Sequence, residues 1–191
     1  MTVTTPKGFR SAGIAVGLKS TGKPDLALVV NDGPEPASAV VFTSNRAQAN
    51  PILWSRKVVQ NGPAQAIILN SGGANCFTGD FGYETTRLTA EAVASALGGD
   101  AEHVLVCSTG LIGSGDQAFR DKIVNGVPAL AAALSAEDKT APAAILTTDS
   151  VEKTASHTSE AGWTIGAMAK GAGLLAPGLA TMLGVVPPDA K

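Results

Sequence analysis

Three segments of small polar residues follow short apolar runs in this 191-residue chain: residues 70–75, 107–113 and 147–149. Segments at strand ends commonly line active sites, because a rigid strand directs the exposed backbone N–H groups that follow it toward a ligand. The pattern indicates a site built from strand ends, but it does not specify the substrate.

The segment 170–183 adds two side chains that can do chemistry, Lys170 and Thr181, in an otherwise apolar, glycine-rich stretch. A lysine there can hold a substrate carboxylate as a point charge, although a solvated surface lysine gives the same pattern. A threonine hydroxyl is a poor nucleophile unless a base lies beside it. From residue types alone, Thr181 is more simply the first residue of a buried strand.

Other chemical groups give weaker signals. Residues 70–73 lack the Gly-Lys-Ser/Thr ending of a phosphate-binding loop, so a nucleotide site is not expected. Nothing near Cys107 in the sequence would lower its pKa, and we interpret it as a packed core thiol. His103 and His157 are isolated and lack the spacing of metal ligands, so no metal site is predicted.

Strands and helices that alternate along the chain must position these groups, which indicates an α/β fold. Apolar runs predict strands at residues 26–30, 40–43, 66–70, 103–107 and 163–168. The run 143–146 is interpreted as a short strand or a helix end. A final apolar run covers residues 182–186.

Two helices are expected between the strands. Asp80 is predicted to cap the first, and Gly98 and Gly99 to end it. The apolar face of this helix is predicted to hold Leu88, Ala92, Val93, Ala96 and Leu97. The second helix lies within residues 119–134, where Pro128 must start, kink or break it. The expected architecture is one α/β domain over residues 1–191, with mixed β-sheets flanked by helices.

Composition and charge exclude several classes of function. The formal net charge of −2 gives no basic surface for nucleic acid or anionic lipid. No apolar run approaches the roughly 20 residues that cross a bilayer, and residues 1–10 do not resemble a signal peptide. The two cysteines lie far apart in the sequence, as in a reduced protein. We therefore expect a soluble, cytoplasmic protein.

Four blocks of the sequence together resemble the ornithine acetyltransferase family of arginine biosynthesis. They are residues 70–75, 107–113, 147–149 and 170–183, and their order and rough spacing match the family. Residues 6–9 are also similar, so the resemblance extends from residue 6 to about residue 186. It implies the N-terminal half of a self-cleaving fold of the N-terminal-nucleophile type.

The resemblance implies a specific activity. The family's precursor cuts itself before a threonine, here between Ala180 and Thr181. The freed threonine accepts an acetyl group from N-acetylornithine and passes it to glutamate by a ping-pong route. No cofactor is implied, although acetyl-CoA is a co-substrate of some members. The partners implied are these substrates and a β-chain, in an assembly of two α and two β chains.

The resemblance also assigns roles to individual residues. Thr181 matches the nucleophile, and Thr109 and Gly110 match the oxyanion hole. Substrate contacts are implied for Thr147, Thr148, Lys170 and Thr181, and which of the two adjacent threonines makes the contact stays open. Cleavage would free an α-amino group on Thr181, whose usual pKa of about 7.7–8 suits a general base near neutral pH.

The sequence departs from the family at its end. Residues 187–191 contain Pro187 and Pro188 where family members usually have a threonine pair, and the family's second half has no counterpart here. We therefore expect an α-chain-like segment, residues 1–180, followed by the first residues of a β-chain, 181–191. The chain alone is expected to be weakly active or inactive, because the short peptide after Ala180 cannot hold its place without a core of its own.

Two alternatives belong to other classes of function. One is a self-processing N-terminal-nucleophile aminopeptidase or amidohydrolase, which would hydrolyse amides without acetyl transfer to glutamate. The other is a non-catalytic fragment that pairs with a separate β-chain.

Overall fold

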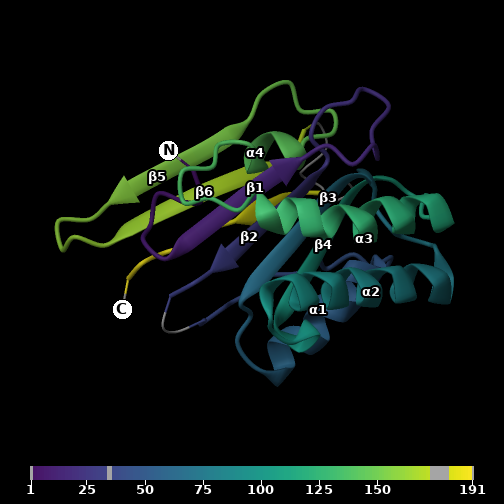
Figure 1. Cartoon of the computed structure of the whole chain (residues 1–191), viewed down its shortest axis with the longest axis horizontal. Helices are drawn as coiled ribbons and strands as arrows, with labels where there is room; N and C mark the ends of the chain where they lie inside the picture. The colour runs from purple at the N-terminus through teal and green to yellow at the C-terminus, as the bar shows by residue number, and fades with distance from the viewer. Residues whose placement is uncertain (1, 34–35, 173–180, 191) are drawn as a thin grey trace.

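The computed structural model of the chain describes residues 2–33, 36–172 and 181–190, which form two β-sheets and several helices packed in layers (Figure 1). The larger sheet has the strand order β1 (Phe9–Ile14), β2 (Leu26–Asn31), β3 (Ala66–Gly73), β4 (Val104–Leu111). The smaller sheet has the order β5 (Lys153–Thr158), β6 (Thr164–Lys170), β7 (Leu183–Val185). The helices are α1 (Asn50–Asn61), α2 (Gly79–Leu97), α3 (Gln117–Ala132) and α4 (Ala141–Ala144), with a 3-10 turn η1 (Ala101–His103).

Strand directions place two of the predicted polar segments, residues 70–75 and 107–113, side by side at one end of the larger sheet. The pairs β1–β2 and β2–β3 are antiparallel, whereas β3 and β4 are parallel. A parallel pair needs a crossover connection, which α2 supplies here. The carboxyl ends of β3 and β4 therefore lie side by side, with Ser71 opposite Thr109 and Gly72 opposite Gly110. The predicted α/β fold with mixed sheets is confirmed.

The core lies on both faces of the larger sheet. Leu26, Leu28 and Val30 of β2 pack with residues of α2 and α3 on one face. Ala27 and Val29, on the other face, pack with α4 and with Met168 of β6. Figure 1 shows the resulting order of layers, with α2 and α3, then the larger sheet, then the smaller sheet. This double covering explains the continuous apolar run of β2.

Side chains of α1 close the outer edge of β4. Ser55 Oγ accepts a hydrogen bond from the Val106 N–H at 3.1 Å and donates one to the Val106 carbonyl at 3.0 Å. Trp54 Nε1 donates to the Val104 carbonyl at 3.0 Å. An edge strand normally leaves such groups unpaired, so α1 here takes the place of a neighbouring strand.

The opposite edge of the larger sheet is closed in a different way. Ser11 of β1 exchanges two backbone hydrogen bonds with Ser135, at 3.1 and 3.0 Å. The Gly13 N–H donates to Thr140 Oγ1 at 2.8 Å. The segment that leads from α3 to α4 therefore covers β1.

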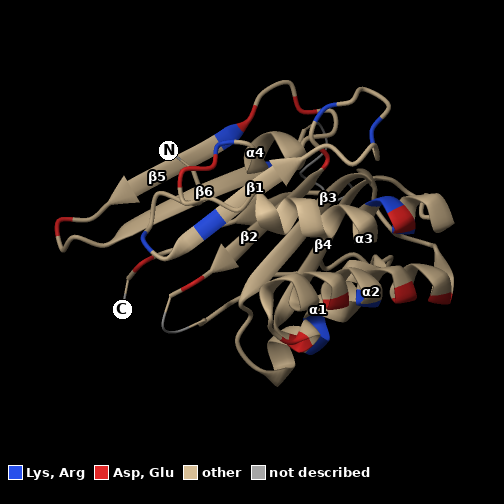
Figure 2. Ribbon diagram, viewed as in Figure 1, with Lys and Arg blue, Asp and Glu red and all other residues tan. Residues whose placement is uncertain are grey.

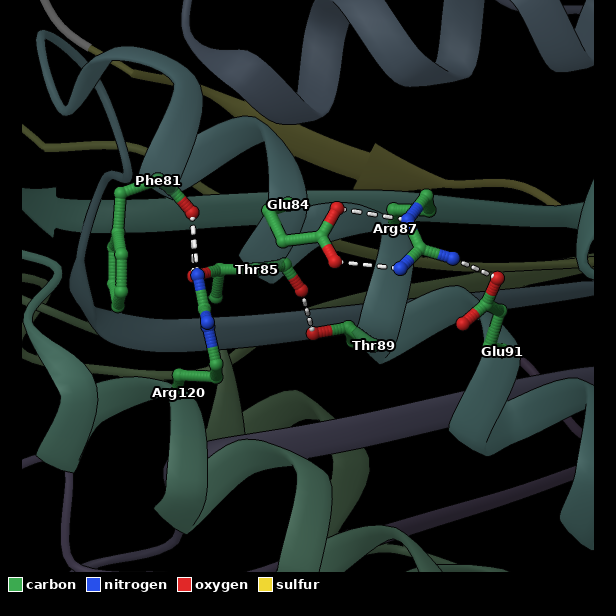
Figure 3. A network of polar contacts seen from close by, with 7 residues as sticks. All are labelled: Phe81, Glu84, Thr85, Arg87, Thr89, Glu91 and Arg120. Atoms are coloured by element: carbon green, nitrogen blue, oxygen red, sulfur yellow. Dashed lines mark hydrogen bonds and ion pairs between the residues drawn. The ribbon is translucent and has the colours of Figure 1, made fainter.

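Helices α2 and α3 are joined by Arg120, as Figure 3 shows. The guanidinium carbon of Arg120 lies 3.6 Å from the centroid of the Phe81 ring. The same group donates to Thr85 Oγ1 at 2.9 Å and to the Phe81 carbonyl at 2.8 Å. The pairs of Arg87 with Glu84 and Glu91 on the same helix are half-exposed and contribute little. Arg120 is therefore the main polar link between the two helices.

The structure corrects the prediction for α2. Thr78 is the N-cap, without a side-chain cap bond, and Asp80 lies in the first turn. Of the predicted apolar face, Val93 is buried, and Ala92 and Leu97 pack against the core while partly buried. The other buried residues of α2 are small or hydroxylated: Gly82, Thr85, Thr86, Thr89, Ala90 and Ala94. The threonine hydroxyls donate to carbonyls four residues earlier in the chain, which removes the usual cost of burying a hydroxyl.

One further prediction is wrong. Residues 40–43 are not a strand, and Val41 is 98% exposed. This short run has no strand edge to pair with, because α1 occupies the edge of β4. Pro128 lies inside α3 without ending it, and the helix continues to Ala132. The run 143–146 contains the end of a helix, α4.

Acidic and basic residues are interspersed along the ribbon, as Figure 2 shows. This distribution agrees with the formal net charge of −2. Among the helices that the structure describes, none combines the length and the apolar character needed to cross a membrane.

Candidate functional site

Lys170 is the centre of a buried polar cluster at the end of β6. The residue is 4% exposed. Its Nζ donates to Thr147 Oγ1 at 2.6 Å and to Thr109 Oγ1 at 3.3 Å, and it lies 3.5 Å from Asp149 Oδ2. Two of the three donors of the ammonium are therefore hydrogen-bonded, and Asp149 Oδ2 contributes an ion pair without a hydrogen bond in the described residues. Residues from three distant parts of the sequence therefore meet at one point.

Asp149 holds this cluster together. Its side chain is fully buried, and its Oδ1 accepts from the Gly171 N–H at 2.8 Å and from Lys153 Nζ at 2.6 Å. Burial alone would raise the pKa of Asp149, but the bonds from Lys153 and Gly171 and the charge of Lys170 outweigh it and lower the pKa to about 2. Asp149 is thus a carboxylate at neutral pH, and it fixes both Lys170 and the backbone that follows it.

The two adjacent threonines of the prediction differ in position. Thr147 accepts the hydrogen bond from Lys170, whereas Thr148 is exposed and makes no hydrogen bond to the described part of the chain. The structure brings Thr147 into the cluster and leaves Thr148 outside it.

Thr109 and Gly110 lie at the end of β4. Thr109 is 1% exposed, and its hydroxyl faces Lys170. Gly110 has a φ of 130°, and a Cβ atom on it would lie 2.6 Å from the carbonyl carbon of Gly72 and from the nitrogen of Gly73. The predicted oxyanion-hole residues therefore sit where β3 and β4 approach too closely for any residue but glycine at position 110.

Thr181 is exposed and lies two residues before β7. In the ladder between β6 and β7, Leu183 is opposite Lys170. The predicted nucleophile therefore begins the strand segment that runs beside the Lys170 end of β6, and it is not part of a buried strand. Ala180, the other residue of the predicted cleavage bond, lies outside the described residues.

The remaining candidate groups do not join this cluster. Burial raises the pKa of Cys107 to about 12, which makes its thiolate scarce. The ring of His157 packs edge-on against Trp163, with centroids 6.4 Å apart. In the part of the chain that the structure describes, no group of His, Cys, Asp and Glu is arranged to bind a metal ion.

The model of the ArgJ family matches residues 10–191. The chain belongs to the ArgJ family. The resemblance seen in the sequence to the ornithine acetyltransferases of arginine biosynthesis is thereby confirmed.

Individual members of the ArgJ family are similar over the whole chain. It is 54% identical over 191 residues to the arginine biosynthesis bifunctional protein ArgJ of Streptomyces coelicolor, covering 100% of this chain and 49% of the relative. The chain therefore spans about half the length of this curated relative.

Solved structures of the ArgJ family share the fold. The ornithine acetyltransferase of Mycobacterium tuberculosis, solved in complex with ornithine, matches with a TM-score of 0.88 and 46% identity, over 95% of this chain and 96% of that chain. The arginine biosynthesis bifunctional protein of Bacillus halodurans matches with a TM-score of 0.75 and 31% identity, over 98% of this chain and 88% of that chain.

Replacing Asp149 with asparagine is expected to destabilise the ArgJ-family chain by about 3 kcal/mol at neutral pH, because it leaves the buried Lys170 ammonium without its countercharge. The measurement is urea-induced unfolding of the purified chain. The control is Glu160→Gln, which neutralises an exposed carboxylate in a turn, and we expect a change within about 0.5 kcal/mol.

The effect of Asp149 is also expected to depend on pH. A carboxyl whose pKa is lowered in the folded state stabilises the fold above its unfolded pKa, and this contribution is lost as the pH falls toward the folded pKa of about 2. The contribution is about 2 kcal/mol, so most of it should disappear between pH 5 and pH 2.5. A difference between the native chain and Asp149→Asn that stays constant over this range would contradict the assignment.

Proposed function

We propose that this chain is the first half of an acetyltransferase of arginine biosynthesis, which moves an acetyl group from N-acetylornithine to glutamate. The observation that carries the proposal is the convergence of Thr109, Thr147 and Lys170 at the end of β6, next to the segment that begins with Thr181. Membership of the ArgJ family and the likeness to an ornithine acetyltransferase solved with ornithine support the same activity.

In the first step, Thr181 Oγ attacks the acetyl carbonyl carbon of N-acetylornithine. The C–N bond of the amide breaks, the nitrogen of ornithine takes up a proton, and the acetyl group remains on Thr181 as an ester. The backbone N–H of Gly110 and the hydroxyl of Thr109 stabilise the oxyanion that forms during the attack. The α-amino group of Thr181, freed by cleavage of the preceding bond, accepts the hydroxyl proton.

In the second step, the neutral α-amino group of glutamate attacks the ester carbonyl carbon. The ester C–O bond breaks, Thr181 Oγ regains its proton, and N-acetylglutamate leaves. Lys170 and Thr147 hold the α-carboxylate that donor and acceptor have in common. Because the ammonium already has three oxygen partners, the substrate carboxylate takes the place of the longer contacts to Thr109 or Asp149.

We also propose that the complete enzyme consists of two chains, of which this sequence covers the first. The Streptomyces coelicolor relative is matched over 49% of its length, whereas the solved Mycobacterium tuberculosis chain is matched over 96%. This difference supports a protein of two chains, with residues 1–180 as the α-chain and 181–191 as the start of the β-chain. An assembly of two α and two β chains in the cytoplasm is part of the proposal.

The test uses a chimera in which residues 1–186 of this chain replace the aligned segment of the Streptomyces coelicolor relative. The purified chimera is incubated with N-acetylornithine and isotope-labelled glutamate. We expect labelled N-acetylglutamate by mass spectrometry, and an intact mass that shows two chains cut before Thr181. Acetyl-CoA is tested as a second donor, and the 191-residue chain alone is expected to transfer no acetyl group.

The outcomes separate the alternatives. A chimera that releases acetate from N-acetylornithine but forms no N-acetylglutamate would be an amidohydrolase. A folded, uncut and inactive chimera would favour a non-catalytic fragment. Either result would overturn the proposed transfer.

A further inference from the structure

A loop between β1 and β2 packs against the candidate site, and Asp25 fixes its conformation. The Asp25 side chain is fully buried. Its carboxylate accepts three backbone hydrogen bonds, from Val16 at 2.7 Å, Leu18 at 2.6 Å and Lys19 at 3.0 Å. Three bonds to one buried carboxylate hold the loop in a single conformation. The backbone positions from which its side chains extend are therefore fixed.

The loop lies against the strand ends that carry the predicted oxyanion hole. A Cβ atom on Gly72 would lie 2.9 Å from the Leu18 carbonyl oxygen and 3.0 Å from Leu18 Cβ. Gly72 is opposite Gly110 in the ladder of β3 and β4. The backbone at residue 18 is therefore in close contact with the glycine that adjoins Gly110.

Lys19, the next residue of the loop, reaches the segment that carries Thr147. Its Nζ donates to the Leu146 carbonyl at 3.2 Å, and Thr147 in turn accepts from Lys170 at 2.6 Å. Lys19 and Lys170 thus bond to consecutive residues of one segment. Two cationic side chains that are distant in the sequence therefore bind neighbouring residues of the segment that carries Thr147.

The two lysines differ in how many donors of their ammonium groups have no hydrogen-bond partner. The ammonium of Lys170 is buried among three oxygens. Lys19 is only partly buried, and within the described chain its one side-chain hydrogen bond is to Leu146, so two of its three donors are open. Burial, opposed by the charge of Asp25 and reinforced by Lys23, lowers the pKa of Lys19. A partly desolvated ammonium with open donors binds a carboxylate more strongly than a fully hydrated one.

We propose that Lys19 contacts the side-chain carboxylate of the glutamate acceptor and thereby selects it. The inference rests on the proposed function, in which one site serves ornithine, with a cationic side chain, and glutamate, with an anionic one. Lys170 and Thr147 bind the α-carboxylate that the two amino acids share, so they do not distinguish them. The ammonium of Lys19, on a flexible stem bonded to the carbonyl of the residue before Thr147, supplies an interaction that only glutamate can use.

The kinetic test compares Lys19→Met with Lys19→Arg in the chimera. In Lys19→Met, the KM for glutamate is expected to rise about tenfold or more through loss of one charge-assisted hydrogen bond. The rate of ornithine release from N-acetylornithine in a single turnover should stay within about twofold. Lys19→Arg keeps the charge and should restore most of the affinity for glutamate. Lys23→Met removes an exposed lysine of the same loop and should change neither half-reaction.

Equal losses in both half-reactions of Lys19→Met would mean that Lys19 only supports the fold, and an unchanged KM for glutamate would rule out the contact. A second measurement does not depend on turnover. The chimera is labelled with an amine-acetylating reagent, and peptide mass spectrometry reports the modification of Lys19 and Lys23. Glutamate is expected to protect Lys19 at least severalfold, and glutamine and ornithine are not.

Equal labelling of Lys19 with and without glutamate would overturn the proposal. If the chimera transfers no acetyl group, the proposed function fails, and the labelling result still decides whether Lys19 meets an acidic ligand.

Discussion

Replacing Thr181 with alanine in the chimera is expected to abolish acetyl transfer, with a fall of at least about a thousandfold in the rate of N-acetylglutamate formation. The reason is that alanine has no hydroxyl oxygen to form the acetyl ester that links the two half-reactions. The same change should leave the chimera as one uncut chain, because an N-to-O acyl shift at the preceding bond needs the same hydroxyl. The measurements are transfer kinetics and intact mass.

Two further variants make the result for Thr181 specific. Thr181→Ser keeps a hydroxyl at the same place and should retain measurable cleavage and transfer. Thr43→Ala removes an exposed threonine distant in the sequence from the site segments and should behave as the unmodified chimera does. Normal cleavage and transfer in Thr181→Ala would remove the central chemical assumption of the proposed function.

Replacing Gly110 with alanine is expected to destabilise the 191-residue chain by about 4 kcal/mol or to prevent its folding. The φ of 130° is strained for alanine, which costs about 1–3 kcal/mol. The new methyl group would also lie 2.6 Å from backbone atoms of Gly72 and Gly73, and such overpacking costs about 1–3 kcal/mol more. Urea-induced unfolding measures the change.

Gly113 provides the matched control for this substitution. It also has a positive φ, of 78°, but nothing lies within 4 Å of a Cβ atom built on it. Gly113→Ala therefore incurs the backbone strain without the clash, and we expect a loss of about 1 kcal/mol. Similar losses for the two variants would show that the close approach of β3 and β4 is not what requires glycine at position 110.

Much of the fold could be predicted because the buried strands β2, β3 and β4 are nearly continuous apolar runs. The strands β1 and β5 were missed because neither is a continuous apolar run. All but one of the β5 residues are exposed, so β5 has no apolar run to reveal it. A turn places β5 beside β6, and this turn is closed by a hydrogen bond of 2.8 Å from the Ser159 N–H to the Trp163 carbonyl. Helix α1 was missed because its buried residues, Pro51, Ser55 and Val58, form only a narrow stripe.

The candidate site could be predicted only in part. The resemblance pointed to Thr109, Thr147 and Lys170, and the structure brings these three together. It did not point to Asp149 or Lys19, whose places depend on tertiary contacts. Asp149 looks like a turn residue after two threonines, and its bond to Gly171 joins segments that no local pattern connects. The catalytic and substrate-binding roles of all these residues stay predictions, including those of Thr148, Gly110 and Thr181.

The closed edges of the larger sheet restrict where further β-strands can be added to the molecule. The hydroxyl of Ser55 and the indole of Trp54 occupy one border, and the backbone of Ser135 occupies the other. At these positions the backbone groups of the edge strands are already paired and cannot accept an added strand. Enlargement of the β-structure by added sequence, in evolution or in assembly, is thereby directed to the three-stranded layer, whose last strand begins beside Thr181.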